Sequence, residues 1–203
     1  MLYLLWRFIE KYKGFYEINL SNCRWDDRMK LYVVRHGETV SNKMMKVSGD
    51  EEALLTNNGV RQAKLLQEEF KDITFDYVFS SPLSRAYETA KLITDNEVII
   101  DKRLLERDYA LNEGKLIADT NPKEIWNYHL NSEINGIEKV QDLFDRISKY
   151  LNDLKNRYDD KTILLVTHSG VARAIYYLIN GIPLDGDLTK VELTNCGYQN
   201  YEI

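Results

Sequence analysis

From residue 29 onward, apolar stretches long enough for a buried strand alternate with stretches of helical periodicity. Short, unbroken apolar runs are typical of central strands in a parallel sheet. Their alternation with helices predicts an α/β fold, a three-layer α/β/α arrangement around a mostly parallel sheet. The expected strands are 30–35, 76–80, 98–100, 162–167, 190–193 and 198–203, and the expected helices are 57–70, 82–93, a short one near 126, 138–157 and 169–180.

Several of these helices carry start or stop signals. Thr56 is a good N-cap for the helix at 57–70. Ser81 followed by Pro82 combines an N-cap with a proline at the first helical position, which predicts that the next helix begins there. Gly181 ends the helix at 169–180.

The composition excludes several classes of protein. The 203 residues are 44% hydrophobic with a net charge of −5, too apolar and too weakly charged for a disordered chain. The acidic balance argues against nucleic acid as a partner. Two cysteines and three histidines offer no disulfide framework and few soft metal ligands, so we expect no metal, no cofactor and a cytoplasmic location. The apolar stretch at 1–9 is too short to span a membrane.

Residues 1–28 differ from the rest of the chain. They hold seven of its 23 aromatic residues, and apolar positions recur there at helical spacing. Three interpretations stay open: an interaction arm, an accessory element packed on its own domain, or an upstream start with Met29 as the functional one. We therefore divide the chain into an N-terminal extension of uncertain role and a domain at 29–203.

Polar residues gather at the ends of three expected strands. The first strand ends in RHGET at 35–39, the second runs into SSPLSR at 80–85, and a later one leads into HSG at 168–170. The carboxyl ends of parallel strands meet at one edge of a sheet, where ligands bind. Two of the three histidines, His36 and His168, occupy such ends. One strand-end histidine alone is usually structural, but two with arginines beside them favour chemistry.

These residue types suit phosphoryl transfer. A neutral imidazole is a nucleophile that can carry a covalent intermediate. If Arg35 and Arg85 flank it, their forked guanidiniums suit the oxygens of a phosphoryl group, while Gly37 lets backbone and ligand approach closely. The departing oxygen needs a proton, for which Glu106 is a candidate. A surface salt bridge is the alternative interpretation of either arginine alone.

Five motifs occur in a fixed order along the chain. They are RHGET with Asn42, LTNNGVRQA at 55–63, SSPLSRAYETA at 80–90, Glu106 with Glu113-Gly114, and VTHSG at 166–170. Together they resemble the histidine phosphatase superfamily, also called the phosphoglycerate mutase-like family. The resemblance covers 29–203 and implies that family's fold and a metal-independent phosphomonoesterase acting on a small phosphorylated metabolite.

The resemblance also implies a role for each matching residue. His36 would attack phosphorus and become a phosphohistidine, and Glu106 would protonate the leaving group and then deprotonate the hydrolytic water. The groups implied to hold the phosphoryl oxygens or the substrate are Arg35, Arg85, His168, Gly37, Asn42, Gly49 and the amide of Ser169. Two departures from the family pattern, Ala110 for a frequent glycine and Asn112 for a frequent aromatic residue, predict a differently shaped wall near Glu106.

Two alternatives remain. A phosphoglycerate mutase is favoured by the run Glu106-Arg107-Asp108-Tyr109, but the segment between Gly114 and His168 is short and holds no pair of adjacent arginines for a substrate carboxylate. A non-catalytic phosphoryl-binding module is the second alternative, although it would be expected to lack His36 or Glu106. The natural substrate and the oligomeric state stay open.

Overall fold

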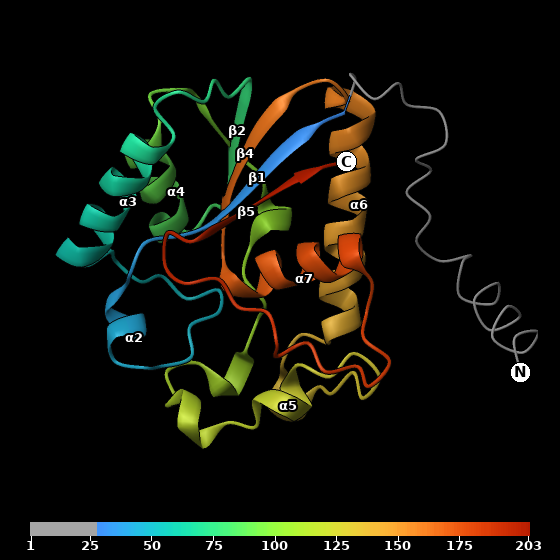
Figure 1. Cartoon of the computed structure of the whole chain (residues 1–203). Helices are drawn as coiled ribbons and strands as arrows, with labels where there is room; N and C mark the ends of the chain where they lie inside the picture. The colour runs from blue at the N-terminus through green and yellow to red at the C-terminus, as the bar shows by residue number, and fades with distance from the viewer. Residues whose placement is uncertain (1–27) are drawn as a thin grey trace, which may run out of the picture.

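The computed structural model describes residues 28–203, so the helix predicted near the N-terminus lies outside the described residues. A five-stranded sheet forms the centre of this part of the chain (Figure 1). Four strands are parallel, and the last pairs antiparallel with the first. The strands are β1 Lys30–Arg35, β2 Tyr77–Ser80, β3 Val98–Ile100, β4 Thr162–Thr167 and β5 Tyr198–Glu202, in the spatial order β3-β2-β4-β1-β5. The predicted mostly parallel sheet is confirmed.

Helices complete the three predicted layers. They are α2 Val40–Lys43, α3 Asn57–Glu69, α4 Ser84–Ile93, α5 Pro122–Ile125, α6 Val140–Tyr158 and α7 Ser169–Asn180, with 3₁₀ turns at Lys102–Leu104, Ala110–Asn112, Ile117–Asp119 and Ile134–Gly136. α3 and α4 cover one face of the sheet, and α6 and α7 cover the other (Figure 1). Among residues 28–203, no helix is both long and apolar enough to cross a membrane.

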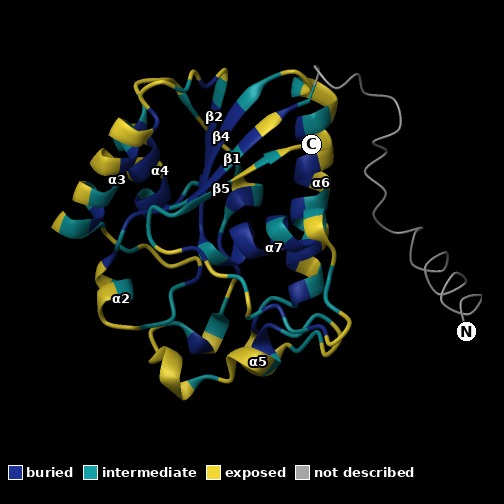
Figure 2. Cartoon of the chain, viewed as in Figure 1, coloured by how far each residue is buried: buried dark blue, intermediate teal, exposed yellow. Residues whose placement is uncertain are grey.

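The two central strands build a core on each face of the sheet, because successive side chains point to opposite faces. Leu31 and Val33 of β1 pack with α6 and α7, whereas Val34 packs under α3 and α4. In β4, the neighbours Leu164 and Leu165 divide in the same way. Figure 2 shows these strands as a buried centre between helices whose outer faces are exposed. Burial on both sides is the reason why these strands read as unbroken apolar runs.

The predicted start of the second large helix is wrong. α4 begins at Ser84, and its N-cap, Leu83, makes no capping hydrogen bond through its side chain. The Ser81 hydroxyl lies 2.8 Å from Nε2 of His168 and accepts only a weak bond from the amide of Leu83 at 3.4 Å. Leu83 still has an extended backbone, so the helix starts one residue later.

The predicted strand at 190–193 is also wrong. This segment is an irregular loop, and its carbonyl groups accept hydrogen bonds from arginine side chains instead of a neighbouring strand. Arg35 donates to the carbonyl of Leu193 at 2.5 Å. Arg173 donates through Nε to the carbonyl of Val191 at 2.7 Å. Of the two predicted closing strands, β5 alone is formed.

Candidate active site

The two strand-end histidines lie side by side. β1 and β4 are adjacent parallel strands that end in register, with Arg35 opposite Thr167. The next residue along each strand is a histidine, and the ring centroids of His36 and His168 are 5.2 Å apart. The sheet itself therefore fixes this pair, since each ring follows directly from a hydrogen-bonded strand.

The ring of His36 is held in the form that a nucleophile needs. Nδ1 lies 2.8 Å from the carbonyl oxygen of Gly37. A carbonyl can only accept, so Nδ1 carries the proton and Nε2 keeps its lone pair. Burial, followed by the positive charges of Arg85 and Arg35, lowers the pKa of His36 well below its usual value. The imidazole is consequently neutral at physiological pH.

His168 has a different hydrogen-bond arrangement. Its Nε2 lies 2.8 Å from the Ser81 hydroxyl, and that hydroxyl already accepts a weak bond from the amide of Leu83 at 3.4 Å. When the hydroxyl donates to Nε2, Nδ1 carries the ring proton and is able to donate. Burial, with the charge of Arg85 and the neighbouring His36, lowers the pKa of His168 well below its usual value.

Two arginines set the electrostatic field around the histidine pair. Arg35 forms an ion pair with Glu192 at 3.5 Å in addition to its bond to the 190–193 loop. Arg85 is 1% exposed and donates to the carbonyls of Gly49 and Glu51, the latter at 2.7 Å. The positive charges of both guanidiniums lower the pKa of His36.

Four buried donor groups at this edge have no hydrogen-bond partner within the described residues. They are Nε of Arg35, Nε of Arg85, Nδ1 of His168 and the hydroxyl of Ser169. An unsatisfied buried donor costs about 1–3 kcal/mol, and more when it is charged. A cluster of cationic and neutral donors without acceptors is suited to an anion.

Glu106 is aimed into the site by backbone amides. One carboxylate oxygen accepts from the amide of Arg107 at 2.8 Å, and the other accepts from the amide of Gly170 in the first turn of α7 at 3.0 Å. Glu106 is 7% exposed. Position 170 requires glycine, because a Cβ there would collide with the Glu106 carboxylate and with Trp126.

Two predicted substrate-binding residues follow β1, Gly37 in the turn after the strand and Asn42 in α2. Gly37 is required by packing, because a Cβ would come within 2.7 Å of the carbonyl oxygen of Gly59. The side-chain oxygen of Asn42 accepts from the amide of Thr39 at 3.2 Å and from Asn195 at 3.0 Å. Because its oxygen is engaged, Asn42 has its amide nitrogen left to donate toward the cavity that it lines.

The backbone of Gly49 is held from both sides. Its amide donates to Glu113 at 2.7 Å, and its carbonyl accepts from Arg85. Gly49 is buried and Ser48 lines the cavity in its place. Glu113 and Arg85 thus hold the loop at Gly49. The predicted contact of Gly49 with substrate stays a prediction.

The two departures in the acid loop lie away from the cavity. Ala110 adopts a left-handed backbone with φ of 44°, a conformation that favours glycine. Asn112 is buried, and its side-chain oxygen accepts from Lys115 and Asn135, each at 3.1 Å. The residue that replaces an aromatic side chain is therefore used to tie the loop to itself.

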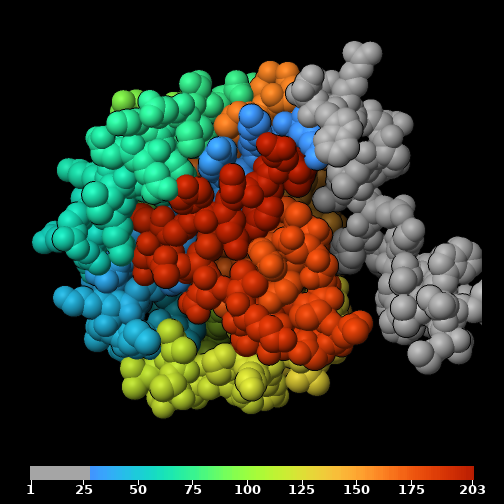
Figure 3. All heavy atoms as spheres, viewed as in Figure 1, coloured from blue at the N-terminus to red at the C-terminus, as the bar shows by residue number. Residues whose placement is uncertain are grey.

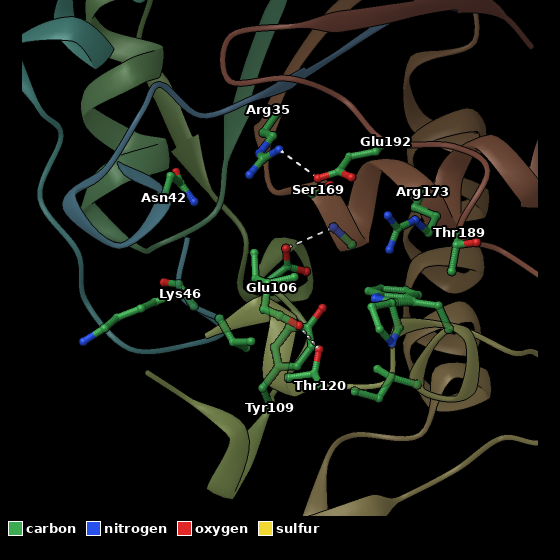
Figure 4. A pocket seen from close by; sticks show the side chains of 17 residues that line it. Arg35, Asn42, Lys46, Glu106, Tyr109, Thr120, Ser169, Arg173, Thr189 and Glu192 are labelled. Carbon is green, nitrogen blue, oxygen red and sulfur yellow. Dashed lines mark hydrogen bonds and ion pairs between the residues drawn. The ribbon is translucent and has the colours of Figure 1, made fainter. Parts of the chain in front are cut away.

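A cavity of about 210 Å³ opens beside Arg35, Glu106 and Ser169 (Figure 4). Of the predicted site residues, Arg35, Asn42, Glu106 and Ser169 line it. His36 and His168 adjoin it through their chain neighbours. Figure 3 shows its walls meeting on one face: the segment around α2, the loop after β3 and the loop before β5.

Sequence reasoning missed the residues on the far side of the cavity. Trp126, Arg173, Thr189 and Glu192 all line it. Trp126 follows the short helix α5 and carried no signal of a binding role. Arg173 did carry a signal of a binding role, because it lies three residues after Gly170 and thus on the same face of α7.

One group of carboxylates could in principle hold a cation. Oxygen atoms of Asp50, Asp108 and Glu113 lie within 4.8 Å of one another. The first two residues are exposed, and Glu113 already accepts from the amides of Gly49 and Tyr109. Exposed acidic groups of this kind are common, and these bonds give the cluster a structural explanation.

Comparison with known proteins agrees with this geometry. The model of the histidine phosphatase superfamily (branch 1) matches residues 31–203. Phosphoserine phosphatase 1 of Hydrogenobacter thermophilus is 29% identical over 184 residues, which is 86% of this chain and 85% of that protein. The protein named probable phosphoglycerate mutase GpmB of Proteus mirabilis is 31% identical over 186 residues, 85% of this chain and 86% of that protein.

A solved structure gives the same result. Phosphoserine phosphatase from Entamoeba histolytica, in complex with 3-phosphoglyceric acid, superposes with a TM-score of 0.72 and 28% identity, over 85% of this chain and 89% of that one. The names of these relatives support phosphatase or phosphoryl-transfer chemistry. With the family model covering nearly all the described residues, the chain belongs to the histidine phosphatase superfamily.

Proposed function

We propose that this protein is a phosphomonoesterase that works through a phosphohistidine at His36. The observation that carries the proposal is the cluster of buried, unpartnered donors beside a neutral imidazole whose Nε2 lone pair is free. That cluster suits the three non-bridging oxygens of a phosphoryl group. The phosphatases among the relatives support the same assignment.

The reaction divides into two displacements at phosphorus. Nε2 of His36 attacks phosphorus as the ester P–O bond breaks, and Glu106 gives its proton to the departing alkoxide oxygen. Water then attacks the phosphohistidine as the P–N bond breaks, and Glu106 takes up the proton that this water loses. Inorganic phosphate leaves, and both residues return to their starting forms.

The remaining site residues stabilise the charge on the transferring group. Arg35 and Arg85 supply the positive charge that spreads over the equatorial oxygens, and His168 adds a neutral donor. Asn42 and Ser169 are further donors at the cavity wall. These groups provide enough charge for the transfer to proceed without a metal ion, so we expect turnover to persist in excess chelator.

The direct test is to trap the intermediate. Rapid quenching during turnover of a ³²P-labelled ester should leave label on the protein that is stable to alkali and lost in acid, as expected for a phosphohistidine. His36→Ala should abolish both the label and phosphate release, with a loss of at least about 10⁴-fold in kcat. His129→Ala is the matched control, because His129 is the remaining histidine and lies outside the cavity lining. Undiminished turnover by His36→Ala would sink the nucleophile assignment.

The same enzyme preparation distinguishes a phosphatase from a mutase. Incubation with 3-phosphoglycerate should release inorganic phosphate and form little 2-phosphoglycerate, because the chain has no adjacent arginine pair to hold the acceptor in place of water. Predominant isomerisation would reverse this assignment. Inactivity across a broad panel of phosphomonoesters, with phosphate binding retained, would favour the non-catalytic binding module instead.

A further inference from the structure

Arg173 is a buried arginine whose fixed position is explained by two contacts, a hydrogen bond and a ring contact. It lies on α7 and is 7% exposed. Its Nε donates to the carbonyl of Val191 at 2.7 Å, and its guanidinium carbon lies 4.2 Å from the centroid of the Trp126 ring. The hydrogen bond and the ring contact hold the guanidinium plane in one orientation.

The outer edge of the same guanidinium is left without an acceptor. Within residues 28–203, its two Nη atoms form neither a hydrogen bond nor an ion pair. Figure 4 shows this edge pointing into the cavity, opposite Glu106 and away from the protein backbone. Glu192, the exposed carboxylate on the same wall, pairs with Arg35 and not with Arg173.

The Nη edge of Arg173 faces the cavity with no acceptor from residues 28–203, and a second positive charge lies on the same wall. Arg35 lines the same cavity, and the charge of Arg173 contributes to the lowered pKa of Arg35, after burial as the main cause. Buried charges in proteins are normally paired. The planar fork of an arginine with two free Nη donors matches a carboxylate, which can accept two parallel hydrogen bonds.

The position of Arg173 defines which part of a substrate it would meet. Glu106, the proposed acid, is held by the amide of Gly170, so the leaving-group oxygen must lie next to that turn of α7. Arg173 is three residues further along the same helical face, roughly 5 Å along the axis. It therefore faces the leaving group, while the strand-end residues face the phosphoryl group.

We infer that the leaving group carries a carboxylate, close to the ester oxygen, which pairs with Arg173. This inference rests on the proposed phosphomonoesterase function and specifies its substrate class. The cavity of about 210 Å³ is smaller than the ~300–1,000 Å³ typical of pockets for drug-sized ligands. A cavity of this size suits a small leaving group in which the carboxylate lies only a few bonds from the ester oxygen.

The test compares esters that differ only in the carboxylate. O-phosphoserine is paired with O-phosphoethanolamine, and 3-phosphoglycerate is paired with glycerol 3-phosphate. We expect the wild-type protein to show a kcat/KM at least about 10-fold higher for the carboxylated member of at least one pair, the size expected for a charge-assisted pair. Arg173→Met should lower kcat/KM for the carboxylated ester alone, so that the kcat/KM values of the two esters in a pair differ by no more than about 3-fold. Arg173→Lys should retain part of the preference.

Arg107→Met is the matched control. Arg107 lies against the same indole, 4.8 Å from the centroid of Trp126, but is bonded to the carbonyls of Glu138 and Ile125 and is not part of the cavity wall. Arg107→Met should weaken the fold and lower kcat/KM equally for the two esters of each pair. Because each ratio is measured within one preparation, a partly unfolded variant does not distort it.

Each result supports or overturns the assignment. A wild-type preference that Arg173→Met removes and Arg107→Met retains would support it. A wild-type protein that hydrolyses both members of each pair equally, or prefers the member without a carboxylate, would overturn the carboxylate inference while leaving the phosphomonoesterase intact. A preference that survives in Arg173→Met would overturn the role of Arg173. Absence of phosphate release from any ester would remove the proposed function, and this inference with it.

Discussion

The two ends of the cavity are built in different ways. At one end, His36 and His168 continue directly from paired strands, so the backbone ladder of β1 and β4 fixes their separation. At the other end, Trp126 and Arg173 meet through loops and one helix face, with no strand pairing between them. The difference teaches that the proposed reaction centre depends on the sheet, whereas the proposed recognition of the leaving group depends on loop packing.

The loop end is held by bonds from side chains to the backbone and by a short backbone bridge, in which the carbonyl of Trp126 accepts from the amide of Leu188 at 3.0 Å. Arg107 is fully buried and donates to two carbonyls, each at 2.7 Å. Arg146 donates to the carbonyls of Arg103 and Leu105 at 2.6 and 2.8 Å. Such bonds can be rearranged by a few substitutions without disturbing the sheet. We therefore expect changes at this end to alter substrate preference and changes at the strand end to alter the rate for every substrate.

The largest effect that sharpens this comparison is expected at Glu106, which lies between the two ends. Glu106→Gln keeps the shape of the side chain and removes the acidic proton that the leaving group needs. It should lower kcat by roughly 10³-fold for alkyl phosphates, whose leaving groups need protonation, and far less for p-nitrophenyl phosphate. A plot of kcat against the pKa of the leaving alcohol checks this. Equal losses across the series would contradict a role as proton donor.

A somewhat smaller effect is expected from Gly170→Ala. The added Cβ collides with the Glu106 carboxylate, so it should displace the proposed acid and lower kcat for alkyl phosphates by roughly 10²-fold. The effect acts through Glu106, so Gly170→Ala combined with Glu106→Gln should be no slower than Glu106→Gln alone. Additive losses in this double-mutant cycle would show that glycine matters for another reason.

Much of the strand end could be predicted from the sequence, because the physics there is local. Strands such as 30–35 and 162–167 are buried on both faces, so their side chains must be apolar throughout, and parallel strands must place His36 and His168 at one edge. The order of layers follows from the alternation of strands and helices alone.

The errors occurred where a distant partner overrides a local pattern. Ser81 is a good cap by type, but its hydroxyl is engaged by His168, 87 residues away in the chain. At 190–193, apolar side chains such as Leu193 pack on the core as a strand's would, yet the carbonyls are taken by Arg35 and Arg173. The stacking of Arg173 on Trp126 likewise depends on a loop whose path no local signal defines.

The strand end should also make stability depend on pH. His36 and His168 have pKa values lowered well below the ordinary 6.5 by burial and nearby arginines. As pH falls through 6.5, the unfolded chain gains protons that the folded chain does not, so stability present above pH 7 is lost on acidification. Each histidine should account for about 1.4 kcal/mol of the loss between pH 7.5 and 5.5.

Urea unfolding at the two pH values measures this effect. Between pH 7.5 and 5.5, the free energy of unfolding of His36→Gln should fall by about 1.4 kcal/mol less than that of the wild-type protein, because glutamine does not titrate. His129→Gln is the control and should leave the loss unchanged, since His129 is exposed in an outer loop. A loss of equal size in His36→Gln and the wild-type protein would show that His36 takes up its proton as readily in the folded state as in the unfolded chain.

A smaller effect tests how His168 is oriented. Ser81→Ala removes the hydroxyl that bonds Nε2 of His168 and leaves the tautomer unfixed, which should lower kcat by about 5-fold, the worth of one neutral hydrogen bond. Ser80→Ala is the matched control, because Ser80 is equally buried but its hydroxyl bonds only the carbonyl of Ser81. Equal effects of the two substitutions would assign the loss to packing.

The smallest effect is expected at Glu192, where the two ends of the cavity meet. Its carboxylate pairs with Arg35 at 3.5 Å but is 64% exposed, so the pair is weak and screened by salt. An anionic substrate competes with Glu192 for Arg35. Glu192→Gln should therefore lower KM by about 2-fold at low salt with kcat unchanged, and the gain should disappear near 0.5 M salt. A raised KM would instead mean that Glu192 itself binds the substrate, and the loop end would then recognise a positive group as well.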